Sequence, residues 1–82
     1  MLVASQMRAA RALLKWSAEK LAENSGLSWK TIQRLESAEG IPSSNVRTLE
    51  AIRSTLEAGG VIFIDADDEG PGVRLRGDRA GQ

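Results

Sequence analysis

Apolar residues recur at helical spacing near the start of the chain. Between residues 5 and 15, the apolar positions separated by three or four residues are Met7, Ala10 and Leu14. This spacing places them on one side of a helix, with basic residues on the other side, and predicts a helix over about 5–15. Leu13 and Trp16 extend the apolar stripe to the helix end, where Trp16 can fold over the next helix.

Two shorter helices are predicted next, over about 18–24 and 29–37, with a tight turn between them. Ser17 and Ser28 are good N-caps, because a serine hydroxyl accepts a hydrogen bond from a free N–H of the first turn. Gly26 can adopt the left-handed conformation that ends a helix. Helices joined by so short a turn must cross steeply, which requires a small residue such as alanine at their contact.

A fourth helix is predicted over about 45–58, after a loop in which Pro42 prevents continuation of the preceding helix. Either Ser44 or Asn45 would cap it. In the loop, Ile41 is expected to place its apolar side chain beneath the two preceding helices. The apolar side of the fourth helix is expected to consist of Val46, Leu49, Ile52 and Leu56.

After two glycines the pattern changes from helical to β-type. VIFID is rich in β-formers, GVRLR alternates apolar and basic residues, and the acidic ADDEGPG between them is typical of a loop. We therefore predict an antiparallel hairpin of 61–65 with 72–76. The fold class is mainly α: a four-helix domain over residues 1–58, a C-terminal two-stranded antiparallel β-hairpin within 59–76, and a disordered tail over 77–82.

The composition argues against catalysis. The chain of 82 residues has no cysteine, histidine or tyrosine, which removes thiolate ligands and the commonest general base. We therefore expect no enzyme, no metal and no cofactor, and no small-molecule ligand is evident. Arg8 and Arg11 interrupt the apolar residues near the start, so we expect no signal peptide, no membrane association and a cytoplasmic protein.

The formal net charge of zero hides an uneven distribution. Residues 1–58 carry eight Lys and Arg against six Asp and Glu, a net of +2. Residues 59–82 carry three against five, a net of −2. The basic excess thus belongs to the helical part, as nucleic-acid binding requires. Because the excess is small, we expect only moderate non-specific affinity for DNA.

The segment 17–37 has the spacing of a helix-turn-helix motif. An ordinary αα-hairpin with small residues at its contact is the alternative interpretation. On these residues the chain resembles the Xre/Cro-type, phage-repressor-like transcriptional regulators, and its GGVIFI and GPGVRLR segments resemble the ending of short members of that family. The expected scaffold residues of the motif are Leu21, Ala22, Gly26, Leu27, Ile32 and Leu35.

In a helix-turn-helix protein the second helix of the motif enters the major groove, and the side chains of its first turns contact base edges. Arginine and lysine suit the edge of guanine, and glutamine suits adenine. Trp29 has an alternative role in packing against the preceding helix. From the position of the cap and from the resemblance, the expected base-contacting residues are Ser28, Trp29, Lys30, Gln33 and Arg34.

The resemblance also has consequences for the DNA backbone. Family members commonly carry a phosphate-binding glutamine where this chain has Ala18, so tight binding is expected to need a dimer. Arg11 resembles a family arginine that pairs with an acid such as Glu36, with DNA contact as its alternative role. Helix N-termini and basic side chains position the backbone. The expected backbone contacts are Ser17, Lys20, Thr31 and Arg47.

The hairpin predicts dimerisation, because a lone two-stranded hairpin is marginal in water and VIFI is apolar on both faces. We expect a homodimer that binds an inverted repeat in double-stranded DNA. The alternative is a monomer whose hairpin folds on its own helices. The expected dimer-interface residues are Val61, Ile62, Phe63, Ile64, Val73 and Leu75.

The function expected from these observations is sequence-specific DNA binding by a small dimeric transcriptional regulator, a repressor or autoregulator. The alternative function is a protein-interaction module, such as an antitoxin-like protein. Its hairpin and acidic loop (Asp65, Asp67, Asp68 and Glu69) would bind a basic partner. A solvated turn is the simplest interpretation of that loop.

Overall fold

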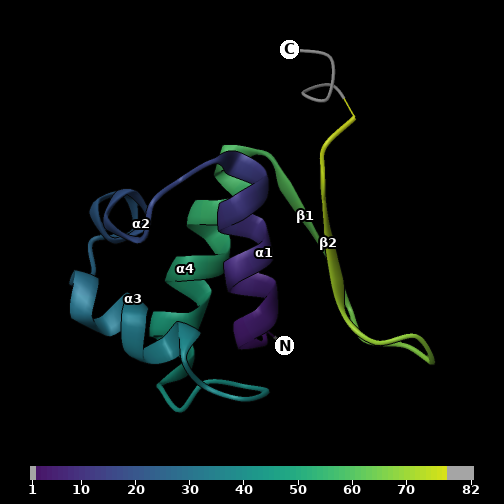
Figure 1. Ribbon diagram of the computed structural model, residues 1–82, viewed down its shortest axis with the longest axis horizontal. Coiled ribbons are helices and arrows are strands. Elements are labelled where there is room, and N and C mark those ends of the chain that lie inside the picture. Colours follow the sequence, from purple (N-terminus) through teal and green to yellow (C-terminus); the bar gives the residue numbers. More distant parts are fainter. Residues whose placement is uncertain (1, 78–82) are drawn as a thin grey trace.

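The computed structural model describes residues 2–77, and the last five residues of the predicted tail lie outside this range. It confirms the predicted fold class, four helices followed by a two-stranded antiparallel hairpin, and every element lies within one residue of its predicted bounds (Figure 1). The elements are α1 (Ala4–Leu14), α2 (Ala18–Ser25), α3 (Trp29–Glu36), α4 (Val46–Gly59), β1 (Val61–Ile64) and β2 (Gly72–Leu75).

The helices begin and end largely where the sequence places its capping residues. The Ser17 and Ser28 hydroxyls accept hydrogen bonds from N–H groups in the first turns of α2 and α3, at 3.0 and 3.1 Å. Asn45, not Ser44, caps α4, because its side-chain oxygen accepts the Thr48 N–H at 2.8 Å. Gly26 ends α2 with a φ of 76°, the left-handed conformation expected there.

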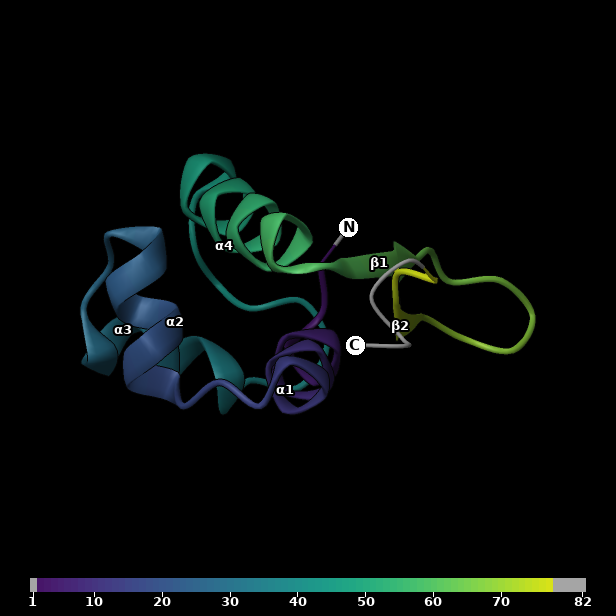
Figure 2. The same ribbon diagram turned by 90° about the horizontal axis from the view of Figure 1, so that it is seen from above.

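The elements form three groups around the central pair α1 and α4. Figures 1 and 2 show α2 and α3 on one side of this pair and the hairpin on the other. The core between the helices consists of large side chains that are fully buried. They are Met7, Leu21, Ile32, Leu35, Ile52 and Leu56, and Val61 joins them from β1. No helix within residues 2–77 has the length and apolar character needed to cross a membrane.

Three predictions of side-chain packing were wrong. Ile41 and Val46 are 48% and 67% exposed. Leu2 and Pro42 are buried instead, and Ile41 faces outward beside Pro42 in the loop. Trp16 packs on the end of α4 rather than on the next helix. Gly59 permits this approach, since a Cβ there would lie only 3.0 Å from the indole ring.

The hairpin presents one face to the helices. Its register pairs Val61 with Leu75, Ile62 with Arg74, Phe63 with Val73 and Ile64 with Gly72. Side chains alternate along a strand, and directly paired residues share a face. The face that packs on the core therefore contains Val61, Phe63, Val73 and Leu75, whereas Ile62, Ile64 and Arg74 face away from it.

This alternation shows where the residues of the predicted dimer interface lie, and the interface itself stays a prediction. Four of its six residues, Val61, Phe63, Val73 and Leu75, pack against their own chain. Only Ile62 and Ile64 remain on the outer face, where Ile64 is 40% exposed. The sequence alone does not give this arrangement, because an apolar run such as VIFI does not tell which of its two faces the helices cover.

Gln6 fastens the hairpin to the first helix. This buried side chain donates from its amide nitrogen to the carbonyl oxygens of Ile64 and Gly72, at 3.1 and 3.0 Å. Its oxygen accepts the N–H of Val3 at 3.0 Å. One amide thus joins the start of α1 to the turn end of both strands. The sequence analysis missed this role, because nothing in the local pattern marks one glutamine among the polar residues of an amphipathic helix.

Candidate nucleic-acid interface

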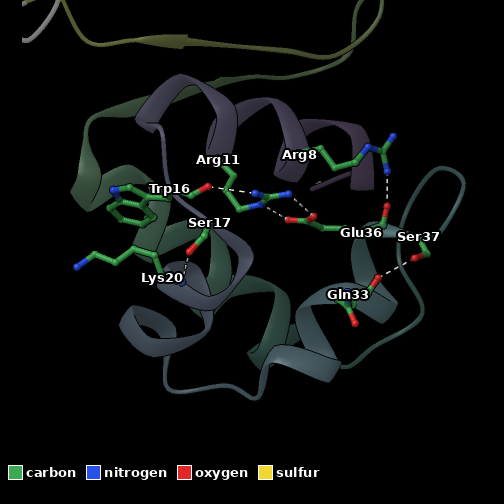
Figure 3. Close-up of polar contacts among 8 residues, drawn as sticks. All are labelled: Arg8, Arg11, Trp16, Ser17, Lys20, Gln33, Glu36 and Ser37. Atoms are coloured by element: carbon green, nitrogen blue, oxygen red, sulfur yellow. Dashed lines mark hydrogen bonds and ion pairs between the residues drawn. The ribbon is translucent and has the colours of Figure 1, made fainter.

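The position of α3 is fixed by two arginines of α1 that bind the same residue. Arg11 donates from Nε and Nη2 to the two carboxylate oxygens of Glu36, both at 2.9 Å. Arg8 donates from Nη1 to the backbone carbonyl of Glu36, so side chain and main chain are both held (Figure 3). The predicted pairing of Arg11 with Glu36 is confirmed. The last turn of α3 is thereby fastened to α1.

Arg11 is stabilised in its charged form. Its hydrogen bonds to the Glu36 carboxylate raise the pKa of Arg11 above its ordinary value, because they stabilise the charged guanidinium. Glu36 is buried, and a planar bidentate pair offsets the cost of removing its charge from water. Arg11 also donates to the Trp16 carbonyl at 3.0 Å, so its donors hold the segment between α1 and α2 as well.

The exposed face of α3 carries three of the predicted base-contacting residues. Lys30, Gln33 and Arg34 are exposed and lie three and four positions apart, which places them on one side of the helix. Trp29 is 45% exposed at the start of α3, so much of its ring is not covered by α2. Ser28 is also exposed, although its hydroxyl bonds both the N–H and the hydroxyl of Thr31.

This face continues onto α1 as a shallow polar hollow. It is lined by Arg8, Lys30, Gln33, Arg34, Glu36 and Ser37. Since the Glu36 carboxylate is paired with Arg11, three cationic side chains define the charge of the hollow. We call these three, Arg8, Lys30 and Arg34, the basic hollow. The sequence analysis missed Arg8; its position one helical turn before Arg11 was the available signal.

Arg34 is already engaged on one side. Its Nη1 donates to the Ser43 carbonyl at 3.0 Å, in the loop between α3 and α4. A guanidinium has five N–H donors, so this bond leaves others free to reach a ligand. The bond also couples the orientation of Arg34 to the conformation of that loop.

The predicted backbone contacts are more dispersed. Ser17 and Lys20 lie at the start of α2, and Figure 3 shows Lys20 pointing away from the side of α3 that carries Gln33. Thr31 is half-buried in the first turn of α3. Arg47 is exposed in the first turn of α4. The structure therefore brings Lys30, Gln33 and Arg34 together, but it does not gather all four backbone candidates beside them.

Two short helices in tight succession, with the second exposing polar and basic side chains, define a helix-turn-helix DNA-binding domain. The chain matches the helix-turn-helix family over residues 7–56, which include all of α2 and α3 and most of α1 and α4. It therefore belongs to the Xre/Cro-like helix-turn-helix family, a generally non-enzymatic family of DNA-binding transcriptional regulators, as its sequence resemblance indicated. A comparison with curated proteins gives no match.

Proposed function

We propose that this chain is a small dimeric regulator, a repressor or autoregulator, that reads double-stranded DNA with α3 in the major groove. The observation that supports this most strongly is the basic hollow on the exposed side of α3. Two of its side chains, Lys30 and Arg34, stand on α3, which Arg8 and Arg11 hold in a fixed position. A rigid support of this kind reduces the entropy that binding must remove.

Lys30 and Arg34 contact guanine in this proposal, because both can donate to its O6 and N7 atoms. Gln33 donates to and accepts from adenine. Trp29 packs on a thymine methyl group or a sugar, and Ser28 contacts the base edge nearest the helix start. The Ser43 carbonyl orients Arg34, and the remaining N–H groups of Arg34 face the groove.

The DNA backbone is held by Ser17, Lys20, Thr31 and Arg47, as the sequence indicates, and by Arg8. Arg8 shares the hollow with Lys30 and Arg34, so a phosphate beside α3 would meet all three charges. Each neutralised phosphate adds about 0.9 to the slope of log affinity against log salt concentration.

Selection of bound duplexes from a random pool tests the whole proposal. We expect an inverted repeat whose half-site centres lie about one helical turn apart. Lys30→Ala and Arg34→Ala should each lower discrimination at one base pair per half-site by about 1–3 kcal/mol. Arg53→Gln is the matched control, because Arg53 lies over Phe63 of the hairpin, and the hairpin is on the side of α1 and α4 opposite α3 (Figure 1). If no sequence is enriched, or if neither α3 variant changes the preference, the assignment fails.

The role of Arg8 needs a separate measurement, because it braces α3 through the Glu36 carbonyl. If Arg8 contacts a phosphate, Arg8→Ala reduces the salt slope by about one and Arg8→Lys restores it. If Arg8 acts only as a brace, Arg8→Ala weakens binding without changing that slope.

A further inference from the structure

The outer face of the hairpin is divided by charge along its length. Ile62 and Ile64 form its apolar centre, and Arg74 faces outward beside Ile62. The backbone N–H of Arg76 donates to the Gly60 carbonyl at 2.8 Å, which continues the ladder and places Arg76 on the same face as Arg74. At the opposite end, the turn carries the exposed carboxylates of Asp65, Asp67, Asp68 and Glu69.

These charges have no partners in their own chain as far as the structure describes it. Among residues 2–77, the two ion pairs are Arg11 with Glu36 and Arg53 with Glu57, and neither involves the hairpin. The only side-chain hydrogen bond in the turn over that range is the Asp67 carboxylate accepting the N–H of Glu69. Along its length the hairpin is therefore acidic at the turn, and its outer face is apolar in the middle and basic at the end far from the turn.

We propose that this face is the docking site of a second copy of the same chain. The two hairpins pack face to face and point in opposite directions, so that the turn of one lies at the far end of the other. This deepens the dimer that the proposed function assumes, and it names the surface and the direction of pairing. Ile62 and Ile64 of the two copies form the central contact. The acidic turn of each copy lies against Arg74 and Arg76 of the other.

Symmetry explains why the occupant is a second copy. A two-fold interface brings the same patch of both subunits together, so a stable patch must complement itself. A two-fold axis across the strands reverses their direction and places each acidic turn on a basic end. An axis along the strands would place acid on acid and base on base, which is unfavourable. The hairpin face is self-complementary only in the reversed arrangement.

The outer face also has a shape suited to close packing. Gly72 lies opposite Ile64 and contributes no side chain, and a Cβ placed there would be 3.7 Å from the Ile64 Cδ1 atom. Ile64 therefore lies over Gly72 and leaves the surface low on the β2 side. The face is nevertheless small, because each strand has only four residues, whereas a standard interface buries roughly 800 Å² per partner. We expect a weak dimer that is sensitive to salt and that becomes strong only when DNA holds two copies together.

Charge reversal of the two ends provides a direct test without DNA. Asp65→Lys with Asp68→Lys brings the turn from four negative charges to a net charge of zero, and it keeps the turn bond of Asp67. Arg74→Glu with Arg76→Glu makes both ends acidic. Dimer dissociation constants are measured by sedimentation equilibrium at low ionic strength, after circular dichroism has confirmed that each variant has the helix content of the wild type.

We expect each double variant alone to dimerise at least tenfold more weakly than the wild type. An equimolar mixture of the two should dimerise more tightly than either variant alone, because the intact acidic turn of one variant then meets the intact basic end of the other. Ile64→Ser is the uncharged comparison: it weakens the dimer while the dependence on salt remains. Unchanged affinity in both double variants, failure of the mixture to dimerise more tightly, or a wild type that stays monomeric at millimolar concentration would each overturn the proposal.

The outcome is independent of DNA recognition. A duplex containing one half-site measures binding by single subunits. If that binding occurs while the charge-reversal pattern is absent, the hairpin proposal alone is wrong. If the charge-reversal pattern appears while no DNA sequence is selected, the hairpin pairing stands and the DNA-reading proposal is wrong.

Discussion

The helical half of the molecule and the hairpin are built on different principles. In the helical half, all four helices contribute to one core, in which Met7, Ile32 and Ile52 are completely buried. The hairpin has two short strands, and only one of its faces is covered. The first region is an enclosed unit, whereas the second is a surface layer with one side open to solvent.

The attachment of the hairpin depends on a few named contacts. They are the burial of Val61 and Phe63, the Gln6 bonds to both strands and the approach of Arg53 to the Phe63 ring. Because different contacts hold the two regions, mutations can change the proposed DNA-reading surface and the proposed pairing surface independently. A change at the hairpin face can alter dimerisation without disturbing the helix that carries Lys30 and Arg34.

The largest effect is expected from truncation in the shared core. Ile32 is completely buried between the helices, so Ile32→Ala should lower the free energy of unfolding by about 2–5 kcal/mol, through lost burial and the cavity left behind. Urea unfolding followed by circular dichroism measures this. Ile41→Ala is the matched control, because the Ile41 side chain is exposed and its loss should cost little. Equal costs for the two variants would contradict the description of an enclosed helical core.

The second effect concerns the fastening of α3. Glu36→Gln keeps the shape of the side chain but removes its charge and one of the two acceptors that Arg11 uses. We expect a loss of about 1.5–3 kcal/mol in the free energy of unfolding, the usual contribution of a hydrogen bond to a charged group. Arg53 and Glu57 form the exposed counterpart, and Glu57→Gln is the control. A cost no larger than that of the control would mean that the Arg11 bonds do not hold α3.

The same pair gives a prediction about pH. Because the folded-state pKa of Arg11 is raised, its contribution is complete below the ordinary arginine pKa and is lost only at more alkaline pH. The difference in unfolding free energy between the wild type and Arg11→Met should therefore be the same at pH 7 and pH 9. A difference that shrinks between these two values would show that the guanidinium loses its proton earlier than the structure implies.

The sequence predicted the helical half better than the hairpin for a physical reason. Helices α2 and α3 are specified locally, since Ser17, Gly26 and Ser28 mark their ends and the apolar spacing marks their inner sides. The Arg11 bond to Glu36 followed from family resemblance. The proposed base-contacting surface could be predicted for the same reason, because a helix whose inner side is known has a known outer side.

What the sequence missed depends on contacts between distant segments. Gln6 reaches strands near the other end of the chain, and Arg8 reaches the last turn of α3. Neither partner lies within the periodic pattern that identifies the helix. The direction in which the hairpin faces was also undetermined, because Ile62 and Phe63 have the same apolar character and only packing distinguishes them.

The next prediction separates the two regions directly. Gln6→Leu removes the amide that binds Ile64, Gly72 and Val3, and it leaves buried polar groups without partners. We expect a local cost of about 1–3 kcal/mol, seen as faster amide exchange in β1 and β2. Exchange in α2 and α3 should be unchanged. Ser5→Ala, at an exposed neighbouring position, is the control. Equal acceleration throughout the chain would show that hairpin and helices unfold as one unit.

The smallest effect is expected where the two regions meet at the side chain of Arg53. Its guanidinium carbon lies 5.2 Å from the centre of the Phe63 ring, and its Nε bonds Glu57 at 3.3 Å. A partly exposed cation over an aromatic ring contributes about 0.5–1 kcal/mol, and a helical ion pair about 0.3–0.5 kcal/mol. Arg53→Gln should therefore lower the free energy of unfolding by about 1 kcal/mol, and Glu57→Gln by less than half as much.

The two variants together decide which contact joins the regions. If the ring contact matters, Arg53→Gln accelerates amide exchange at Phe63 and Val73, whereas Glu57→Gln leaves exchange in the hairpin unchanged. Arg53→Lys should show an intermediate effect, because an ammonium keeps the charge but lacks the flat guanidinium surface that lies over the ring. If Arg53→Gln and Glu57→Gln lower the free energy of unfolding equally and neither changes amide exchange in the hairpin, Arg53 stabilises only its own helix through Glu57. Gln6 and the buried side chains of the hairpin would then be sufficient to hold it.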